Sequence, residues 1–394
     1  MVTSTASQLE QYRQQFPALA NKAYFNFGGQ GTLAEPALAA IFETHRQIQE
    51  KGPFSLGVHD LLDQLGAETK QLLGKELGAP PQTITLTENV TVGCNIALWG
   101  INWQAGDQIL MTDCEHPGIV ATVREICRRF QVEVSICPLM ETLNQGDPVA
   151  VIARYLQPQT RLLILSHLLW NTGQVLPLAA ITQLCHQHQP QAVQVLVDAA
   201  QSVGSLPLNL TELNADFYAF TGHKWLCGPA GVGGLYVRPE AFSQLNPTFI
   251  GWRGIVKDLR GNPVSWTDDG SRFEVATSAY PEYAGLREAI FIHQKWGDAQ
   301  ERYQQICQLS AFLWEGLGQI SGIKCLKNSP PEAGLVSFEL ASNYSPNKLV
   351  QSLEKRGFLL RTIADPHCIR ACVHYFTTKT EIEHLLEAIG NLVT

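Results

Sequence analysis

The sequence predicts an α/β fold in which a mostly parallel sheet of seven strands, with helices on both faces, is followed by a smaller α+β domain. Three observations support this prediction. The chain has 394 residues, 45% of them apolar and 16% charged, which is enough apolar material for a large buried core. Short β-branched runs alternate with helical patterns between about residues 83 and 237. After about residue 262 a long helical stretch replaces that alternation, so two domains are expected.

Seven short runs in the first region have the composition and spacing of strands: 83–87, 108–112, 132–138, 161–166, 193–197, 217–221 and 234–237. Helical patterns follow three of them, at 117–129, 148–156 and 178–188, and the first two begin with proline. Such alternation indicates crossover units and therefore parallel strands. Ligands of such sheets bind beyond the carboxyl ends of the strands.

The later region predicts one long helical stretch, then strands interleaved with helices. The helical stretch covers 282–320, the strands 334–340, 358–362 and 368–375, and the helices 346–356 and 380–393. Thr378 and Glu381 have the spacing of a capping box for the last helix. We therefore expect an N-terminal helical arm (1–20, with its helix at 7–16) that packs with the small domain, a large domain (21–262) and a small α+β domain (263–394).

Charge and composition exclude several classes of protein. The 28 basic and 36 acidic side chains give a net charge of −8 and are dispersed, which argues against nucleic acid as a partner. The N-terminus has no apolar core of a signal peptide, and no run of about 18 uncharged apolar residues predicts a membrane span. The ten cysteines are scattered without a Cys-x-x-Cys pair, so reduced thiols are expected. These features predict a cytoplasmic protein.

The strongest local signal is Lys224, which follows the predicted strand 217–221 directly and precedes a glycine-rich run. A lysine at a partly desolvated strand end has a lowered pKa and can form a Schiff base. The alternative is an ordinary lysine in a surface loop.

Two further strand ends carry side chains that suit an aromatic cofactor. Asp198 ends the apolar run 193–197, and a carboxylate there can hold a pyridinium nitrogen, although it can also simply cap a helix. His116 stands between a strand and a helix, where an imidazole can lie flat on an aromatic ring. The helix start after strand 83–87 offers free N–H groups and the Thr91 hydroxyl to a phosphate. A lone histidine or helix start of this kind is usually structural.

Taken together, Thr91, His116, Asp198-x-x-Gln201 and Thr221-Gly222-His223-Lys224 resemble the fold-type I pyridoxal phosphate enzymes, in the class V aminotransferase branch that includes the cysteine desulfurases. The resemblance covers most of the chain, from about residue 24 to the last helix. It implies the fold-type I architecture, with pyridoxal 5'-phosphate as the cofactor and 21–262 as the domain that binds it.

The resemblance also implies individual roles. Lys224 forms the Schiff base with the cofactor, Asp198 pairs with the pyridine nitrogen, and His116 stacks on the ring. Gln201 and Asn171 match positions that contact the phenolic oxygen of the cofactor. The positions that bind its phosphate are matched by Val90 (main chain), Thr91, Thr221 and His223. The segment 272–277 resembles one in which a neighbouring subunit lends a threonine, here Thr277, to the phosphate. A homodimer with shared active sites and no metal is therefore expected.

Two arginines close together near the C-terminus point to the substrate. The position of Arg370 clamps the substrate α-carboxylate in the family, and Arg361 suits a second carboxylate, with structural salt bridges as the alternative. Gly28, Gly29 and Trp252 are candidates for the pocket wall, since glycines leave room for an extended disulfide substrate. Turn and core roles are the alternatives for these three residues.

One departure from the desulfurase pattern separates possible reactions. Desulfurases of this branch carry a reactive cysteine on a mobile loop, where this chain has Asp365-Pro366 in a shorter segment; Cys368 lies nearby. The chain looks most like the cystine C–S lyase of the branch, which implies β-elimination from L-cystine, and more weakly from L-cysteine. The products would be cysteine persulfide, pyruvate and ammonia, with sulfur passed to iron–sulfur cluster assembly through an acceptor such as a ferredoxin. A cysteine desulfurase that releases alanine is the alternative, followed by a transaminase or epimerase.

Other classes of function have weaker support. The glycine-rich run 228–234 leads into a strand, whereas a dinucleotide fingerprint opens a helix. A structural metal could use the ligands His367, Cys368, Cys372 and His374; three of them share a strand face, but Arg370 lies on that same face and would repel a cation. A non-catalytic binding protein would leave Lys224 and Asp198 idle.

Overall fold

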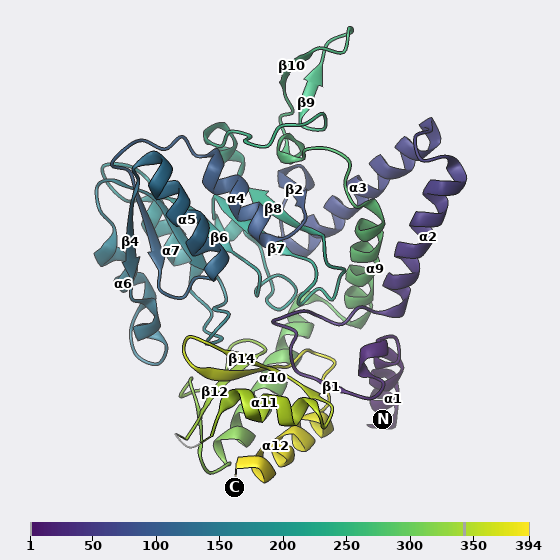
Figure 1. Ribbon diagram of the computed structural model, residues 1–394, viewed down its shortest axis with the longest axis vertical. Helices are drawn as coiled ribbons and strands as arrows, with labels where there is room; N and C mark the ends of the chain where they lie inside the picture. The colour runs from purple at the N-terminus through teal and green to yellow at the C-terminus, as the bar shows by residue number, and fades with distance from the viewer. Residues whose placement is uncertain (1, 342–343, 394) are drawn as a thin grey trace.

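The computed structural model describes residues 2–341 and 344–393 (Figure 1). A seven-stranded sheet with its helices forms one body, and a four-stranded sheet with its helices forms the other. The strands of the large sheet are β2 (Ile84–Thr87), β3 (Gln108–Thr112), β4 (Glu133–Cys137), β5 (Thr160–Ser166), β6 (Gln194–Asp198), β7 (Phe217–Thr221) and β8 (Gly233–Val237). Their order is β2-β8-β7-β6-β5-β3-β4.

The predicted fold class is confirmed. Neighbouring strands from β7 through β4 are parallel, whereas β8 runs antiparallel to both β2 and β7. Strand β8 reverses because the short link after Thr221, which carries Lys224, contains no crossover helix, and parallel strands need one. Thr221 consequently pairs with Gly233, and Lys224 lies in the loop between them.

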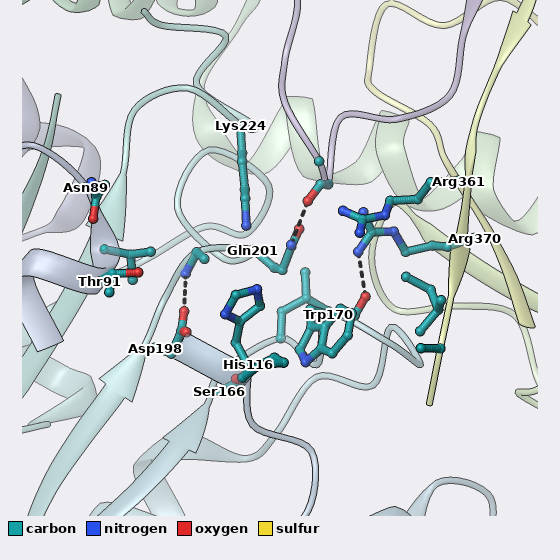
Figure 2. A pocket seen from close by; sticks show the side chains of 18 of the residues that line it. Asn89, Thr91, His116, Ser166, Trp170, Asp198, Gln201, Lys224, Arg361 and Arg370 are labelled. Atoms are coloured by element: carbon teal, nitrogen blue, oxygen red, sulfur yellow. Dashed lines mark hydrogen bonds between the residues drawn. The ribbon is translucent and has the colours of Figure 1, made fainter. Parts of the chain in front are cut away.

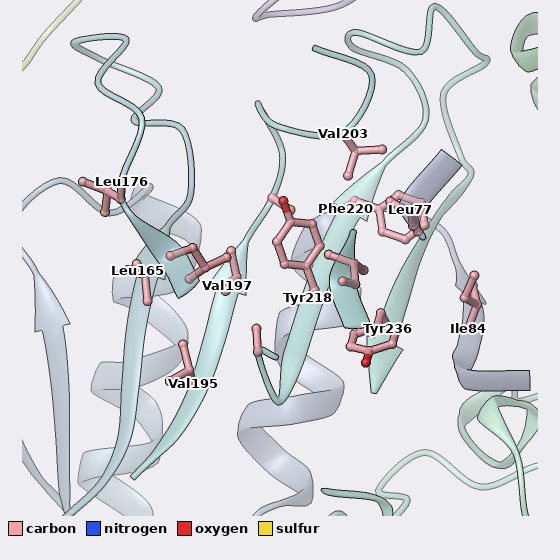
Figure 3. Packing of buried hydrophobic residues seen from close by; sticks show 14 of the residues in the cluster. Leu77, Ile84, Leu165, Leu176, Val195, Val197, Val203, Tyr218, Phe220 and Tyr236 are labelled. Carbon is pink, nitrogen blue, oxygen red and sulfur yellow. The ribbon is translucent and has the colours of Figure 1, made fainter. Parts of the chain in front are cut away.

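Helices cover both faces of this sheet because side chains along each strand alternate between two apolar clusters. Leu110, Leu163, Val195 and Tyr218 pack against helices α3 (Leu56–Leu77), α6 (Pro148–Tyr155), α7 (Leu178–His186) and α9 (Tyr280–Trp296). Figure 3 shows part of this cluster, with Val195 and Tyr218 labelled. Their neighbours Ile109, Leu162, Leu196 and Phe217 pack against α4 (Val90–Gly100) and α5 (Pro117–Phe130). Burial on both faces fits strands that are apolar throughout.

The N-terminal segment joins the two bodies. It contains α1 (Val2–Arg13), η1 (Pro17–Leu19), β1 (Ala23–Tyr24), α2 (Glu35–Lys51), α3 and η2 (Pro81–Thr83). Helix α1 ends at Arg13, before the predicted end at residue 16, because Pro17 favours an extended Phe16. Arg13 pairs with Glu381 at 2.6 Å, and Phe16 stacks on Phe376. Helix α2 packs along α9.

The second body contains α10 (Ala299–Gly318), β11 (Ile323–Cys325), β12 (Leu335–Leu340), α11 (Pro346–Glu354), β13 (Phe358–Leu359), β14 (Arg361–Ile363), β15 (Cys368–Cys372) and α12 (Lys379–Val393). Its sheet has the antiparallel order β11-β12-β15-β14, while β13 pairs with β1.

Three predictions for this region were wrong in detail. The helical stretch 282–320 is two helices, because Asp298 starts α10 with a capping box to Glu301. The strand 358–362 is split between two sheets as β13 and β14, so Arg361 is the first residue of a separate strand. The strand expected at 368–375 ends at Cys372, which leaves His374 and Tyr375 beyond it. The capping box of the last helix is present, since Glu381 N–H donates to the Thr378 hydroxyl at 3.1 Å and its carboxylate accepts from Thr378 N–H at 2.8 Å.

A hairpin that the sequence analysis did not predict projects from the large body (Figure 1). It consists of β9 (Ile255–Lys257) and β10 (Pro263–Trp266), and Leu259 at its turn is fully exposed. Short helices complete the chain: η3 (Leu139–Thr142), α8 (Leu210–Leu213), η4 (Pro239–Gln244) and η5 (Gly270–Phe273). Across residues 2–341 and 344–393, no helix has the length and apolar character needed to cross a membrane. The domain boundaries and the cytoplasmic location stay predictions.

Candidate active site

A pocket of about 1000 Å³ opens beyond the carboxyl ends of the central strands, where β14 and β15 of the second body approach them (Figure 2). It brings together eleven of the residues expected at the site: Gly28, Gly29, Val90, Thr91, His116, Asp198, Gln201, His223, Lys224, Arg361 and Arg370. They come from the N-terminal segment, the large sheet and the C-terminal sheet, so three distant parts of the chain build one pocket.

Lys224 reaches into the pocket from the loop between β7 and β8 (Figure 2). Burial lowers the pKa of Lys224 to about 8; the Asp198 carboxylate opposes this shift, and Arg370 and Arg361 add to it. A substantial fraction of this amine is therefore neutral near pH 8, as a nucleophile or a base requires.

Asp198 lies at the carboxyl end of β6, with one carboxylate oxygen accepting the Ala200 N–H at 2.9 Å. The other oxygen has no hydrogen-bond partner within the described part of the chain. A nearly buried carboxylate with a free oxygen in a pocket can receive a protonated ring nitrogen.

His116 caps α5, because its Nδ1 accepts the Gly118 N–H at 3.2 Å. Burial lowers the pKa of His116, while Asp198 opposes the shift and the positive charges of Lys224 and Arg361 add to it. The ring is therefore neutral and keeps its proton on Nε2. It stands edge-on to the Trp170 indole, with the ring centroids 5.7 Å apart.

The N-terminus of α4 forms another wall of the pocket. Asn89 caps this helix, with its Oδ1 accepting the Val92 N–H at 3.1 Å. The N–H groups of Val90 and Thr91 are the first two of the helix and have no partner inside it. Unpaired N–H groups, the helix dipole and the Thr91 hydroxyl together suit a phosphate.

Arg370 is a buried arginine, only 1% exposed, in the middle of β15. Its Nη1 donates to the Trp170 carbonyl at 2.6 Å, while Nε and Nη2 have no partner within the described chain. Arg361 lies opposite it on β14. Burial lowers the pKa of Arg361, and the charge of Arg370 adds to the shift. Two guanidinium groups without a carboxylate partner make this side of the pocket an anion site.

These groups fit pyridoxal phosphate as a set. Lys224 supplies an amine for the aldehyde, Asp198 a free carboxylate oxygen for the ring nitrogen, and His116 a flat neutral ring. The start of α4 supplies unpaired N–H groups for the phosphate. The buried nitrogens Nε and Nη2 of Arg370 remain without a partner in the described part of the chain and could pair with an anion.

Four expected residues do not line the pocket of this chain. Asn171 is buried beside Trp170, with its Oδ1 lacking a partner among the described residues, and Thr221 is buried, with its hydroxyl 2.6 Å from His223 Nδ1. Thr277 is exposed, and Trp252 is 54% exposed and packs on the Arg253 guanidinium. Their roles stay predictions.

Several lining residues were missed by the sequence analysis, among them Asn89, Ser166, Trp170 and Asn347, while His367, considered there as a metal ligand, also lines the pocket. Ser166 ends a strand and Asn89 begins a helix, which are the same signals that selected Asp198 and Thr91.

Glu115 was also missed. It is buried beside the pocket and accepts hydrogen bonds from the Thr112 hydroxyl and from the N–H and hydroxyl of Ser166, at 2.6, 2.9 and 2.9 Å. Ser166 and Asp198 are register partners on adjacent strands, so Glu115 braces the strand end next to Asp198.

Cys368 lies outside the pocket. It is fully buried in β15, and burial raises the pKa of its thiol to about 12. His374, which was considered above as a metal ligand, donates to the Trp225 carbonyl through its Nε2, at 3.0 Å. The described residues contain no group of three or more histidine, cysteine, aspartate or glutamate side chains placed to hold a metal.

The fold and this pocket define a pyridoxal-phosphate-dependent enzyme of fold type I. The chain belongs to the class-V aminotransferase family, whose family model matches residues 49–385. The predicted family, cofactor and dependence on pyridoxal phosphate are thereby confirmed.

Relatives in this family have different reactions. Isopenicillin N epimerase of Streptomyces clavuligerus is 27% identical over 93% of this chain and 94% of its own length. A probable cysteine desulfurase of Xylella fastidiosa strain 9a5c is 25% identical over 98% of this chain and 95% of its own length. A solved cysteine desulfurase of Thermococcus onnurineus, 22% identical with a TM-score of 0.86 over 98% of both chains, shares the fold.

Two solved structures of C-DES are much more similar. Both are 55% identical to this chain and cover 96% of it and 99% of their own chain, with TM-scores of 0.95 and 0.94. One is a lysine-to-alanine mutant with glycine covalently linked to the PLP cofactor. The other is the complex of the cystine C–S lyase C-DES with its reaction product, cysteine persulfide.

Proposed function

We propose that the chain is a carbon–sulfur lyase that acts on L-cystine, and more weakly on L-cysteine, by β-elimination. The observation that carries this proposal is the pair Arg361 and Arg370 in a pocket whose described lining residues include no cysteine. Cystine has two carboxylates, and its elimination needs no sulfur acceptor on the enzyme. The likeness to C-DES, a cystine C–S lyase, supports the same reading.

The arginines orient the substrate. We assign the α-carboxylate of the reacting half to Arg370, whose unpaired Nε and Nη2 offer two donors from a rigid, buried side chain. Arg361, which is exposed at the edge of the pocket, takes the carboxylate of the far half. Because cystine is held at both ends, its reacting Cα and Cβ stay near Lys224, and the molecule cannot rotate freely in the pocket.

Lys224 moves the proton. With its pKa lowered to about 8, its Nζ takes the proton from the substrate Cα. When bound, pyridoxal phosphate supplies an electron sink for the pair left at Cα, and Asp198 keeps the ring nitrogen protonated. The residues that would hold this group are His116 at the ring face, the α4 N-terminus with Thr91, Thr221 and His223 at the phosphate, and Gln201 and Asn171 at the phenolic oxygen. Asn171 and Thr221 do not line the pocket of this chain, so their roles rest on the family resemblance.

The carbon–sulfur bond between Cβ and the nearer sulfur of cystine then breaks. The electron pair at Cα forms the Cα–Cβ double bond, and the Cβ–S pair leaves with the sulfur as cysteine persulfide. A persulfide is a better leaving group than a thiolate because its conjugate acid is stronger. The released three-carbon fragment, aminoacrylate, takes up water and gives pyruvate and ammonia. The persulfide is a form of sulfur suited to iron–sulfur cluster assembly, with an acceptor such as a ferredoxin as a partner.

We also propose that the enzyme works as a homodimer with shared sites. Thr277 is exposed, as are Phe249, Ile250 and Trp252, at 69%, 56% and 54%. These side chains lie in the segments that flank the projecting hairpin β9–β10 (Figure 1). A second subunit that covers this apolar face would receive Thr277 at its phosphate and Trp252 at its pocket wall.

Product analysis tests the proposal against a desulfurase. With cystine supplied, we expect pyruvate and ammonia in equal amounts and no alanine. Cys368→Ala should turn over like the unaltered enzyme, because the Cys368 thiol is buried with its pKa raised to about 12. Alanine together with an enzyme-bound persulfide that disappears in Cys368→Ala would overturn the proposal in favour of a cysteine desulfurase.

A further inference from the structure

The two residues that follow Lys224 have their carbonyl groups held by buried histidines. His293 Nε2 lies 2.7 Å from the Leu226 carbonyl, and His374 Nε2 lies 3.0 Å from the Trp225 carbonyl. The two imidazoles are stacked, with centroids 5.6 Å apart. Neither histidine lines the pocket, so neither is part of the site described above.

The direction of these hydrogen bonds follows from their partners. A carbonyl oxygen only accepts, so both Nε2 atoms carry a proton. Burial lowers the pKa of His293 well below its usual range and that of His374 to about 3, so both rings are neutral. In His293 the remaining nitrogen, Nδ1, is therefore an acceptor, and it accepts from the Tyr375 hydroxyl.

The chain of hydrogen bonds continues to the N-terminal helix. Since the Tyr375 hydroxyl donates to His293, its oxygen accepts from the hydroxyl of Tyr12 in α1, whose other acceptor, the Ile292 carbonyl, is farther away at 3.4 Å. The series Tyr12, Tyr375, His293 and the Leu226 carbonyl thus has one consistent direction. All three side chains are buried, from 9% exposed at Tyr12 to fully enclosed at Tyr375. We name these three side chains the tyrosine–histidine relay.

The same segment is held from a second direction. The Trp225 indole N–H donates to Gln201 Oε1 at 2.9 Å, and Gln201 Nε2 donates to the Gly28 carbonyl at 2.8 Å. Gly28 in turn packs against the Arg370 guanidinium. If these positions served only to fill space, apolar side chains would do so without the cost of burying polar groups. Hydrogen bonds directed at the carbonyl groups of Trp225 and Leu226 therefore imply a positioning role.

We infer that Tyr12, Tyr375 and His293 are positioning residues for Lys224, and that through them the N-terminal helix α1 sets the orientation of the lysine amine. The inference rests on the proposed function in one respect, that Lys224 binds the cofactor and moves the α-proton. The relay touches neither Arg361 nor Arg370, so substrate binding is largely independent of it.

Conservative variants of the holoenzyme test this role. Tyr375→Phe removes the middle hydroxyl and Tyr12→Phe the first one. Tyr303→Phe is the matched control, because it removes a hydroxyl that donates to the Glu332 carbonyl at 2.9 Å and is not hydrogen-bonded to the relay. The measurements are kcat and KM for cystine, the thermal midpoint, and the visible circular dichroism of the bound cofactor, which reports how asymmetrically it is held.

We expect Tyr375→Phe to lower kcat about tenfold with KM changed by less than about twofold, since misplacing a base slows proton transfer more than binding. Its visible ellipticity per cofactor should fall, and Tyr12→Phe should show the same changes to a smaller extent. Tyr303→Phe should keep both kcat and ellipticity. If Tyr375→Phe does not fold, Tyr12→Phe at the end of the relay decides the question by the same readouts.

The inference is overturned if both relay variants lose thermal stability yet keep the kcat and ellipticity of Tyr303→Phe. A failure of the proposed function looks different, because the unaltered enzyme would then form no pyruvate from cystine. The ellipticity comparison still tests the relay in that case, since it needs bound cofactor and no turnover.

Discussion

Arg361 and Arg370 are directly opposite each other across the antiparallel strands β14 and β15. Directly opposite residues project from the same face of a sheet, with Cβ atoms about 5 Å apart, and like charges at such positions are destabilising. Neither has a carboxylate partner within 4 Å in the described part of the chain, whereas 14 contacts between other arginines or lysines and carboxylates are present there. An unfavourable pair at the pocket wall fits the proposed substrate, cystine, which brings two carboxylates.

The first prediction concerns Arg361. Arg361→Ala should lower kcat/KM for cystine about tenfold or more, because one charge-assisted carboxylate contact is lost. A β-substituted amino acid with a single carboxylate should be affected far less. Arg356→Ala, which removes an exposed arginine outside the pocket, serves as the charge-matched control. Equal losses on both substrates would contradict the assignment of two carboxylates.

The second prediction concerns Gly28. A Cβ at this position would lie 2.9 Å from Cζ and Nη2 of Arg370 and 3.0 Å from the Cys372 sulfur. Gly28→Ala should therefore displace the Arg370 guanidinium and raise KM for cystine about tenfold. Gly57→Ala, on helix α3 with nothing within 4 Å of the added Cβ, is the control. An unchanged KM in a folded Gly28→Ala enzyme would show that Arg370 does not clamp the substrate.

The third prediction concerns Lys224. Lys224→Ala and Lys224→Arg should each lower pyruvate formation by about a thousandfold or more, since neither side chain can take the α-proton near neutral pH. Borohydride should fix the cofactor to Lys224 in the unaltered protein, as mass spectrometry of its peptides will detect. Lys75→Ala, at an exposed position on α3, should behave like the unaltered enzyme. Retained turnover in both Lys224 variants would refute the catalytic assignment.

The fourth prediction concerns the buried carboxyl of Glu115. Burial raises the pKa of Glu115 to about 7 from its usual 4.5; the bond from Thr112 opposes the shift, and the Asp198 charge adds to it. Between these pH values the folded chain holds a proton that the unfolded chain has released. The free energy of unfolding therefore falls as the pH rises through this window, and the stabilisation is fully present only below about pH 4.5.

Glu115→Gln cannot release this proton, so its stability should fall less between pH 5 and pH 8. Denaturant unfolding at both pH values measures the difference, which we expect to be on the order of 1–3 kcal/mol. Glu133→Gln removes an exposed carboxylate at the start of β4 and should leave the pH dependence unchanged. If the free energy of unfolding changes equally with pH in the unaltered protein and in Glu115→Gln, the pKa of Glu115 is not raised in the folded state.

Much of the cofactor side of the pocket was predictable from local sequence. The seven strands of the large sheet have short apolar cores, and their ends are visible in the chain as changes from apolar to polar residues. Asp198 ends β6, and Lys224 and His116 lie in the loops that follow β7 and β3. Since the carboxyl ends of parallel strands meet at one edge, their proximity followed from the fold class.

The strand register was less predictable. The pairing of Arg361 with Arg370 depends on a split between β13 and β14, and that split arises because β13 pairs with β1 more than 330 residues earlier in the chain. The buried Glu115 lies next to His116 in sequence, yet its importance comes from hydrogen bonds to Ser166 on a strand 51 residues away. Neither relationship can be recognised from residues that are close together in the sequence.

The sequence by itself determined the α/β fold, the family and most of the residues that line the pocket, because these depend on strand ends and short motifs that the chain carries locally. Only the tertiary structure decided which residues support them. Tyr12 and Tyr375 are 363 residues apart, and the hydroxyls meet because α1 packs against the end of the C-terminal sheet. Such contacts follow from the docking of whole elements, whose free energy is spread over many apolar side chains and is invisible in any single stretch of sequence.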